Sequence, residues 1–444
     1  MNILQKLSSS QIRLSLRNAG WMFFDKIFRM ATSLLVGIWL ARYLGPEQFG
    51  ILNYAILFPT IFLSIAGFGL NNILMIEYTA AAGDLLKQRK LVSGGVYIKF
   101  TIGCLTYLMS FLANYILNYS NDVLFVIINI TGSVLIFQSS EAIDTYFQAR
   151  SRAKLSVIVK SLALFTTSIF RIYAIINKLD IIYFVMINFI ELLISYILTL
   201  IVVRTALEAN IFDIIKEIDL RIIKKLSSQS WPIMLSEFFV FIYMKIDQFM
   251  IKSLSTDHEI GYYTAALRLS EVWYFIAIAI TASFYPNIAK YYDSDRKNFL
   301  ALYQKLINIL SFISIIISIF ISMFSSSLVY FIFGEQYTGV APILSVHIWS
   351  GVFVFTGVGI SNLMVIENLQ KFILVKTIIG AFVNVLLNIW LIPRFGALGA
   401  SVATLIAYSL SAYFLNFFYT KAKFIFAMQT QSFTNFLTLK SFRG

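Results

Sequence analysis

Ten charged side chains interrupt stretches of the sequence that are otherwise apolar. They are Asp25, Lys26, Arg29, Arg171, Glu191, Glu237, Lys245, Asp247, Arg268 and Glu271. An arginine can bind a phosphate through two parallel N–H donors, and its charge does not titrate away. A carboxylate in the same surroundings can carry a coupling proton or cation. These residue types indicate a site for a phosphate-bearing substrate, with ion pairs between helices as the alternative.

The spacing of the first group places it on one side of a helix. At about 100° per residue, an arc of about 120° holds Asn18, Asp25, Lys26, Arg29, Thr32 and Ser33. An ionisable residue at the centre of a membrane costs about 2.5–3.5 kcal/mol, so this stripe must face a cavity or another helix. Asp25 and Arg29 are four residues apart and can pair.

Two later segments carry similar patterns. An arc of about 80° holds Ser230, Glu237, Lys245 and Gln248. Asp247 lies on another side of that segment, while Arg268 and Glu271 are three residues apart and can pair. Four carboxylates are candidates to carry a coupling ion or to form ion pairs: Asp25, Glu237, Asp247 and Glu271.

The sequence offers little support for catalysis or metal chemistry. Cys104 is the only cysteine, and His258 and His347 are far apart with no cysteine partner, so a zinc site is not expected. No glycine-rich phosphate loop follows a strand, and no nucleophile–base pair is evident. We therefore expect no catalytic residue, no metal and no cofactor.

The elements that position these charges are long apolar segments. The chain of 444 residues is 59% hydrophobic and 13% charged, and its mean hydropathy is +0.79. A soluble domain carries about 25% charged residues, whereas a membrane-spanning helix needs about 20 apolar residues. The segments that qualify are 18–41, 48–72, 93–117, 122–143, 155–176, 181–203, 230–252, 261–288, 305–333, 340–366, 371–392 and 396–420. We predict an all-α polytopic membrane protein with about twelve transmembrane helices.

Lysine and arginine residues are distributed unequally between the two sets of loops. If the N-terminus lies inside, 23 of them fall in cytoplasmic segments, and only Arg42, Lys178, Lys252 and Arg394 fall on the other side. Because basic residues concentrate on the cytoplasmic side, we predict a multi-pass protein with both termini in the cytoplasm. This topology and contact with anionic lipid explain the net charge of +13, so we do not expect a nucleic-acid partner.

The longest segment between the predicted helices divides the chain into two halves. Trp21 and Trp231 are 210 residues apart and Gly50 and Gly261 are 211 apart, which indicates a weak internal repeat or a coincidence of composition. Two repeats with an even number of helices would surround a substrate path between them. The predicted parts are a cytoplasmic N-terminus (1–17), an N-terminal six-helix lobe (18–203), a cytoplasmic inter-lobe segment (204–229), a C-terminal six-helix lobe (230–420) and a cytoplasmic tail (421–444).

Several stretches of the sequence resemble one family of transporters. One stretch of this chain resembles the N-terminal part of O-antigen and polysaccharide-unit flippases (the Wzx type): NAGWMFFDKIFRMATSLLVGIWLARYLGPEQFGILNYA. Its most specific part is ARYLGPEQFG. The second lobe of that family resembles SWPIMLSEFFVFIYMKIDQFMI and IGYYTAALRLSEVWYF, and its last two helices resemble LNIWLIPRFGALGASVATLIAY. These flippases belong to the multidrug/oligosaccharidyl-lipid/polysaccharide exporter superfamily, and the similarity spans residues 18–420.

The resemblance implies two six-helix bundles around a central cavity that opens alternately to each side of the bacterial inner membrane. It implies that the substrate is a polyprenyl-pyrophosphate-linked oligosaccharide, and it suggests coupling to a proton or sodium gradient. Binding of the pyrophosphate would fall on Arg29, Arg268 and Lys26. A polysaccharide polymerase and chain-length proteins are candidate partners.

Two other functions remain open at this point. A drug or cation antiporter of the same fold would need no lipid-linked sugar. A membrane polysaccharide polymerase or glycosyltransferase is disfavoured, because such enzymes usually need a sizeable outer loop and the predicted outer loops are short.

Overall fold

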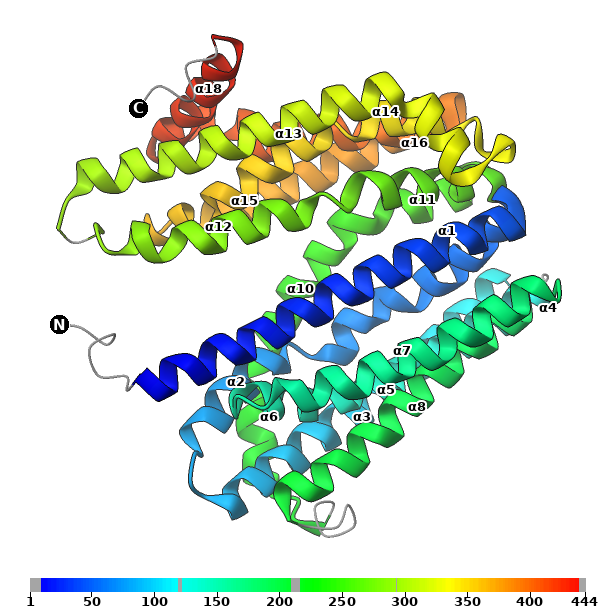
Figure 1. Cartoon of the computed structure of the whole chain (residues 1–444), viewed down its shortest axis with the longest axis vertical. Helices are drawn as coiled ribbons and strands as arrows, with labels where there is room; N and C mark the ends of the chain where they lie inside the picture. Colours follow the sequence, from blue (N-terminus) through cyan, green and yellow to red (C-terminus); the bar gives the residue numbers. More distant parts are fainter. Residues whose placement is uncertain (1–8, 119–121, 209–215, 293, 439–444) are drawn as a thin grey trace. The chain divides into compact units, whose positions relative to one another are not determined.

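Apolar segments of this length fold as α-helices because a helix satisfies its backbone hydrogen bonds internally, as the interior of a membrane requires. The computed structural model describes residues 9–118, 122–208, 216–292 and 294–438. Every regular element within these residues is helical (Figure 1).

The helices of the first half of the chain are α1 (Ser9–Gly67), α2 (Leu70–Ala80), α3 (Leu85–Asn118), α4 (Asp122–Gly132), α5 (Val134–Phe137), η1 (Gln138–Ser140), α6 (Glu141–Ala149), α7 (Ala153–Ile176) and α8 (Ile181–Leu207). Those of the second half are α10 (Leu220–Leu254), α11 (Asp257–Glu271), α12 (Tyr274–Ala289), α13 (Arg296–Phe333), η2 (Glu335–Tyr337), α14 (Val340–His347), α15 (Ser350–Ile366), α16 (Gln370–Ser409), η3 (Leu410–Phe414), α17 (Leu415–Phe418), η4 (Thr420–Ala422) and α18 (Lys423–Leu437).

Nine helical segments of the described residues are long and apolar enough to cross a membrane. Two of them, with 61 and 49 residues, are long enough for two crossings each. Gly45 (φ 70°) and Gly396 (φ 56°) interrupt these two segments with non-helical backbone angles. Helix α10, with 35 residues, supplies a further crossing although it carries several charges. Together these segments account for about twelve crossings and confirm the predicted all-α polytopic membrane fold.

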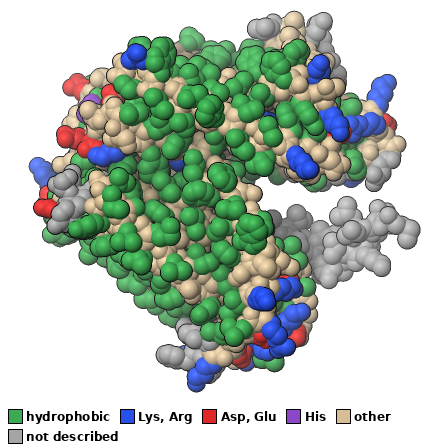
Figure 2. Space-filling view, turned by 180° about the vertical axis from the view of Figure 1, so that it is seen from behind, with side chains coloured by type: hydrophobic (Ala, Val, Ile, Leu, Met, Phe, Trp, Pro, Cys, Tyr) green, Lys and Arg blue, Asp and Glu red, His purple; other side chains and the backbone are tan. Residues whose placement is uncertain are grey.

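Large hydrophobic side chains cover much of the outer surface. Figure 2 shows wide areas of them, with lysine and arginine side chains gathered near the margins of the view. Ile116, Ile176 and Phe331 are 79%, 73% and 80% exposed. A protein in water rarely exposes apolar patches of this extent, whereas lipid tails solvate them well.

Contacts within the chain define two compact units. Unit 1 comprises Met1–Tyr43 and Leu52–Phe241, and unit 2 comprises Leu44–Ile51 and Ile242–Gly444. In unit 1, helices α2, α3 and α6 meet around Tyr78, whose hydroxyl donates to the Ala142 carbonyl over 3.1 Å. Tyr146 packs against Tyr78 and donates to Oε1 of Gln88 over 3.1 Å. These buried tyrosines fix α6, which carries several side chains of the site described below.

Unit 2 has a core of its own between α12, α13, α15 and α18, built around Phe299, Leu310 and Phe355. Residues 423–437, which the sequence assigns to a tail, form α18 and pack along α13. The Nε2 atom of Gln304 on α13 donates to the Met428 carbonyl on α18 over 3.0 Å.

The segment Leu44–Ile51 packs in unit 2 through two glycines. A Cβ atom on Gly50 would lie 2.0 Å from the Asp257 carbonyl oxygen, and one on Gly261 would lie 2.0 Å from that of Pro46. Backbones can approach this closely only where side chains are absent. The two glycines that the sequence places at matching positions of a repeat therefore lie against each other.

Candidate functional site

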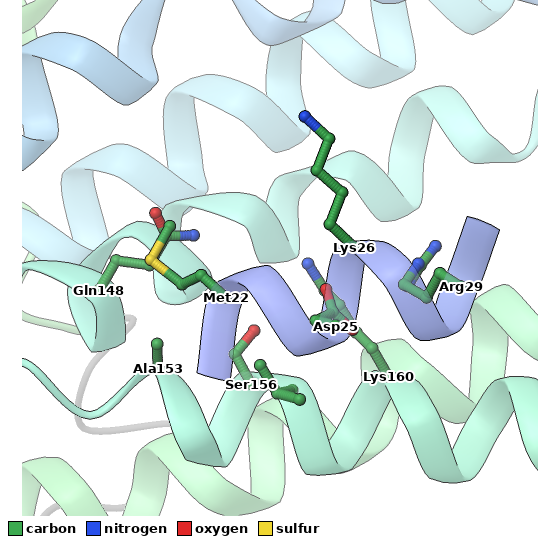
Figure 3. Close-up of a pocket in the computed structure, with 9 residues that line it drawn as sticks. Met22, Asp25, Lys26, Arg29, Gln148, Ala153, Ser156 and Lys160 are labelled. Carbon is green, nitrogen blue, oxygen red and sulfur yellow. The ribbon is translucent and has the colours of Figure 1, made fainter. Parts of the chain in front are cut away.

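A pocket of about 320 Å³ opens in unit 1 between the first half of α1 and the start of α7 (Figure 3). It is lined by Met22, Asp25, Lys26, Arg29, Gln148, Ala153, Ser156, Val157 and Lys160. The predicted polar stripe of α1 supplies three of these residues, and α6 and α7 supply the side chains that face them. The pocket thus brings together charges that are more than a hundred residues apart in the sequence.

Asn18 fastens the beginning of the stripe to the turn between α6 and α7. Its Oδ1 atom accepts from the backbone N–H of Ala153 over 2.8 Å, and its Nδ2 atom donates to the Gln148 carbonyl over 3.4 Å. One turn further along α1, the Lys154 ammonium lies 5.4 Å from the centroid of the Trp21 ring. These contacts set the position of α1 along α7.

The carboxylates of the pocket are held by different groups. Asp144 on α6 accepts from the Ser156 hydroxyl and pairs with the Lys160 ammonium at 2.5 Å. Figure 3 shows Asp25 near the end of the Lys160 side chain between α1 and α7. The charges of Arg29, Lys160 and Asp144 act on Asp25, whose Oδ1 atom is buried without a hydrogen-bond partner in the described residues.

The predicted pair between Asp25 and Arg29 is not formed in the structure. Within the described residues, no carboxylate lies within 4.0 Å of the Arg29 guanidinium or the Lys26 ammonium. Both side chains are exposed, and Lys26 extends away from α7 (Figure 3). The pair fails because Asp25 turns toward α7. The pocket consequently presents two cations whose charge no neighbouring carboxylate neutralises directly.

The third predicted phosphate ligand, Arg268, belongs to unit 2 and is set on α11. Its guanidinium carbon lies 4.9 Å from the centroid of the Phe49 ring, in a cation–π contact within the same unit. Glu271, which the spacing allows to pair with Arg268, has its carboxylate 3.8 Å from the Lys245 ammonium.

Asp247 is the most enclosed charge of unit 2. Its Oδ2 atom accepts from the hydroxyls of Tyr263 and Thr404, the latter over 3.2 Å, and its Oδ1 atom accepts from the Gln248 N–H over 2.9 Å. Within the described part of the chain, no lysine or arginine lies within 4.0 Å of its carboxylate. Neutral hydroxyl groups and a backbone N–H therefore contact Asp247 directly, and the charge of Lys245 acts on it from more than 4.0 Å away.

Glu237, on the part of α10 that belongs to unit 1, lies near a charged pair that the sequence analysis did not identify. The Lys99 ammonium on α3 lies 2.8 Å from Oε2 of Glu141 on α6, and both charges act on Glu237. Another pair, Arg171 with Glu191, joins α7 to α8 at 2.6 Å.

The sequence analysis also missed Asp144 and Lys160, which lie close to the ends of predicted helices, where charges are expected. A usable signal was present for α6, because Glu141, Asp144 and Gln148 follow one another at three and four residues on one helical face.

Among the residues described, no group of three or more histidine, cysteine, aspartate or glutamate side chains could hold a metal ion.

Two family models match the sequence. The model described as "Polysaccharide biosynthesis protein" matches residues 15–292, and the MatE model matches residues 232–390. The comparison with curated proteins found no match.

Solved transporter structures share the fold over nearly the whole chain. The lipid II flippase MurJ in an inward closed conformation is 15% identical, with a TM-score of 0.67 over 97% of this chain and 93% of that chain. An inward-facing multidrug resistance MATE family transporter of the MOP superfamily is 14% identical, with a TM-score of 0.69 over 94% and 96%. A MOP superfamily transporter from Pyrococcus furiosus, described as having a binding pocket of reverse polarity, is 14% identical with a TM-score of 0.61 over 96% of each chain. At these identities the likeness establishes the fold alone.

Proposed function

Because this chain belongs to the polysaccharide biosynthesis protein family, we propose that it is a flippase for a polyprenyl-pyrophosphate-linked oligosaccharide. The substrate is an O-antigen or related polysaccharide repeat unit, as the Wzx-type motifs suggest, and it crosses the bacterial inner membrane by alternating access. The observation that carries the proposal is the pocket of unit 1, in which Lys26 and Arg29 are exposed and have no ion-pair partner among the described residues.

The charge of this pocket suits a pyrophosphate. Its lining includes three cations, Lys26, Arg29 and Lys160, and one carboxylate, Asp25. Lys160 is paired with Asp144 on α6, so Lys26 and Arg29 are the cations left to a ligand. An arginine side chain can place two N–H donors on two phosphate oxygens, and a lysine adds a point charge. Unpaired cations inside a membrane protein are costly, which supports a functional role for them.

The same charge argues against the antiporter alternative. A cationic drug that entered this pocket would meet the exposed ammonium of Lys26 and the guanidinium of Arg29, with Asp25 as the one carboxylate of the lining. The positive charges of Arg29 and Lys160 act on half-buried Asp25, which makes it a weaker partner for a cationic drug.

Coupling to a proton or sodium gradient is assigned in this proposal to Asp247 rather than to Glu271. Asp247 is surrounded by hydroxyl oxygens from Tyr263 and Thr404, whereas Glu271 already pairs with Lys245. An enclosed carboxylate with no direct ion-pair partner can exchange a bound cation or proton as the gradient requires. Arg268, packed on Phe49, is a secondary candidate for phosphate contact.

The remaining features of the proposal follow from the sequence. Both termini lie in the cytoplasm, residues 18–203 and 230–420 form the two lobes, and a polymerase and chain-length proteins take over the translocated unit.

The function can be tested in a host that lacks its own polysaccharide flippase. Expression of the full chain should restore surface polysaccharide and should leave resistance to a cationic dye unchanged. The same protein in proteoliposomes should translocate a fluorescent polyprenyl-pyrophosphoryl oligosaccharide. Dye export without any translocation of the lipid-linked sugar would overturn the proposal in favour of the antiporter.

A further inference from the structure

A second polar cluster in unit 1 is organised around Glu141 at the start of α6. Its Oε2 atom accepts from the Lys99 ammonium over 2.8 Å, from Nδ2 of Asn71 over 3.2 Å and from Nε2 of Gln138 over 3.4 Å. Asn71 is oriented in turn by the Thr145 hydroxyl, which lies 3.4 Å from its Oδ1 atom. One carboxylate oxygen is thus fully used by groups from α2, α3 and η1.

The two charges of the pair differ in exposure. The Lys99 side chain is 0% exposed, but the Glu141 side chain is 39% exposed. The comparable pair in this unit, Arg171 with Glu191, is 13% and 19% exposed. The Arg171–Glu191 pair thus keeps both partners largely enclosed, whereas the Lys99–Glu141 pair leaves its carboxylate partly open. A partly open carboxylate in lipid tails would be costly, which favours water or a ligand beside Glu141.

The second carboxylate oxygen of Glu141, Oε1, is a hydrogen-bond acceptor in a site whose charge is balanced by Lys99. No hydrogen bond within the described residues reaches Oε1 of Glu141, while the Lys99 charge balances that of the carboxylate. Such an oxygen accepts strong hydrogen bonds. A charged ligand group gains little electrostatic binding energy there, because Lys99 and Glu141 balance each other. Sugar hydroxyls can donate to this oxygen, and the exposed Asn71 amide beside the carboxylate adds a directed donor and acceptor.

The cluster around Glu141 lies along α6 from the pocket of unit 1. Glu141 and Gln148, which lines the pocket, are separated by about 10 Å at 1.5 Å per residue. The charge of Lys160, also in the pocket lining, acts on both Asp25 and Glu141. Glu237 on α10 faces the same pair of Lys99 and Glu141. Glu141 therefore lies about two helical turns along α6 from the lining of the pocket, close enough for the charge of Lys160 to act on it.

From this arrangement, and resting on the proposed function, we infer that Glu141 and Asn71 form a subsite for hydroxyl groups of the sugar nearest the pyrophosphate. Lys99 and Gln138 hold the carboxylate in place and touch no substrate. Arg29 and Lys26 recognise the phosphate, which every lipid-linked intermediate has in common, whereas Glu141 distinguishes a sugar-bearing lipid from a bare one.

The test compares binding of three probes to the purified full-length protein: polyprenyl pyrophosphate, and the same lipid carrying one N-acetylhexosamine or one hexose. The wild-type protein should bind at least one sugar-bearing probe about tenfold more tightly than the bare lipid, as one or two hydrogen bonds to a charged acceptor predict. Glu141→Gln should lose this difference and should bind the bare lipid unchanged.

Two further variants separate recognition from folding. Glu141→Gln leaves the Lys99 ammonium buried without its partner, so protein level can fall. The double variant Lys99→Met with Glu141→Gln removes both charges, and it should recover protein level without recovering sugar discrimination. The matched control, Arg171→Met with Glu191→Gln, neutralises the enclosed pair of α7 and α8 and should keep full discrimination.

The outcomes are distinguishable. Full sugar discrimination in the double Lys99 and Glu141 variant would overturn the subsite, leave the proposed function intact and assign the pair a structural role. A wild-type protein that binds neither the bare nor the sugar-bearing lipid would overturn the proposed function, and the subsite with it.

Discussion

Units 1 and 2 hold their membrane-embedded charges in different ways. In unit 1, Lys26 and Arg29 are exposed at a pocket and have no carboxylate within 4.0 Å in the described residues. In unit 2, Asp247 is buried among neutral hydroxyls, and Lys245 is paired with Glu271. Both units meet the cost of charge in a membrane, and the pocket of unit 1 places two exposed cations beside each other without a carboxylate within 4.0 Å in the described residues. Accessibility, rather than the number of charges, therefore separates a binding site from a structural or coupling site.

The largest effect should follow from Arg29→Ala. Losing two charge-assisted hydrogen bonds of about 1.5–3 kcal/mol each predicts a loss of at least a hundredfold. Surface polysaccharide in a flippase-deficient host should fall to background at normal protein level, whereas Arg29→Lys should retain part of it. The double neutral variant of Asp25 and Arg29 should remain inactive. If the double variant regained activity, Arg29 would serve only to balance Asp25.

A strong but different effect is expected for Asp247→Asn in unit 2. The amide keeps the size of the side chain but removes the charge that a coupling ion needs, so stimulation by an imposed proton or sodium gradient should fall about tenfold. Binding of polyprenyl pyrophosphate to the purified protein should be unchanged, in contrast to Arg29→Ala. Unaltered stimulation by both gradients would remove Asp247 from coupling.

A moderate loss of stability should follow from Asn18→Leu. This change removes both hydrogen bonds that fasten α1 to the turn between α6 and α7, at a cost of about 1–2 kcal/mol. The purified protein should melt a few degrees lower, and transport should fall only in part. Ser33→Ala, on the same stripe but without a hydrogen bond among the described residues, should melt like the wild type. Equal melting of both variants would mean that Asn18 does not position α1.

The smallest effect should come from Glu271→Gln. The Lys245–Glu271 pair is long, at 3.8 Å, and its side chains are 28% and 37% exposed, so it contributes less than about 1 kcal/mol. Polysaccharide level should change less than twofold. A loss as deep as that of Arg29→Ala would contradict the difference between the units and place substrate contact in unit 2.

The sequence was sufficient to predict the helical membrane fold because the signal is local. Each crossing needs only a continuous apolar run, and the periodicity of α1 placed Asp25, Lys26 and Arg29 on one face. Two long helical segments bend at Gly45 and Gly396; Gly45 lies between two predicted crossings, and Gly396 is the first residue of the last predicted crossing.

The residues that pack against the polar face of α1 could not be predicted from the sequence. Lys160 and Asp144 come from α7 and α6, and helical periodicity does not say which distant helix packs on a given stripe. The spacing of Asp25 and Arg29 permitted a pair, yet the structure turns Asp25 toward α7 and leaves Arg29 unpaired among the described residues. Lys99 escaped notice because it lies near the start of a predicted helix, where a lysine can reach the membrane surface.

If the pocket of unit 1 receives the pyrophosphate through Arg29, a bound ligand should protect a single cysteine in the pocket lining from chemical labelling. Cys104 is the only natural cysteine, so Cys104→Ser provides the background for Met22→Cys in the pocket and for Lys224→Cys, an exposed control on α10. Polyprenyl pyrophosphate should slow labelling of Met22→Cys by a polar thiol reagent several-fold, polyprenol should not, and the control should be unaffected. Adding Arg29→Ala should abolish the protection. Equal protection with and without Arg29, or by polyprenol as well as by the pyrophosphate, would contradict the account.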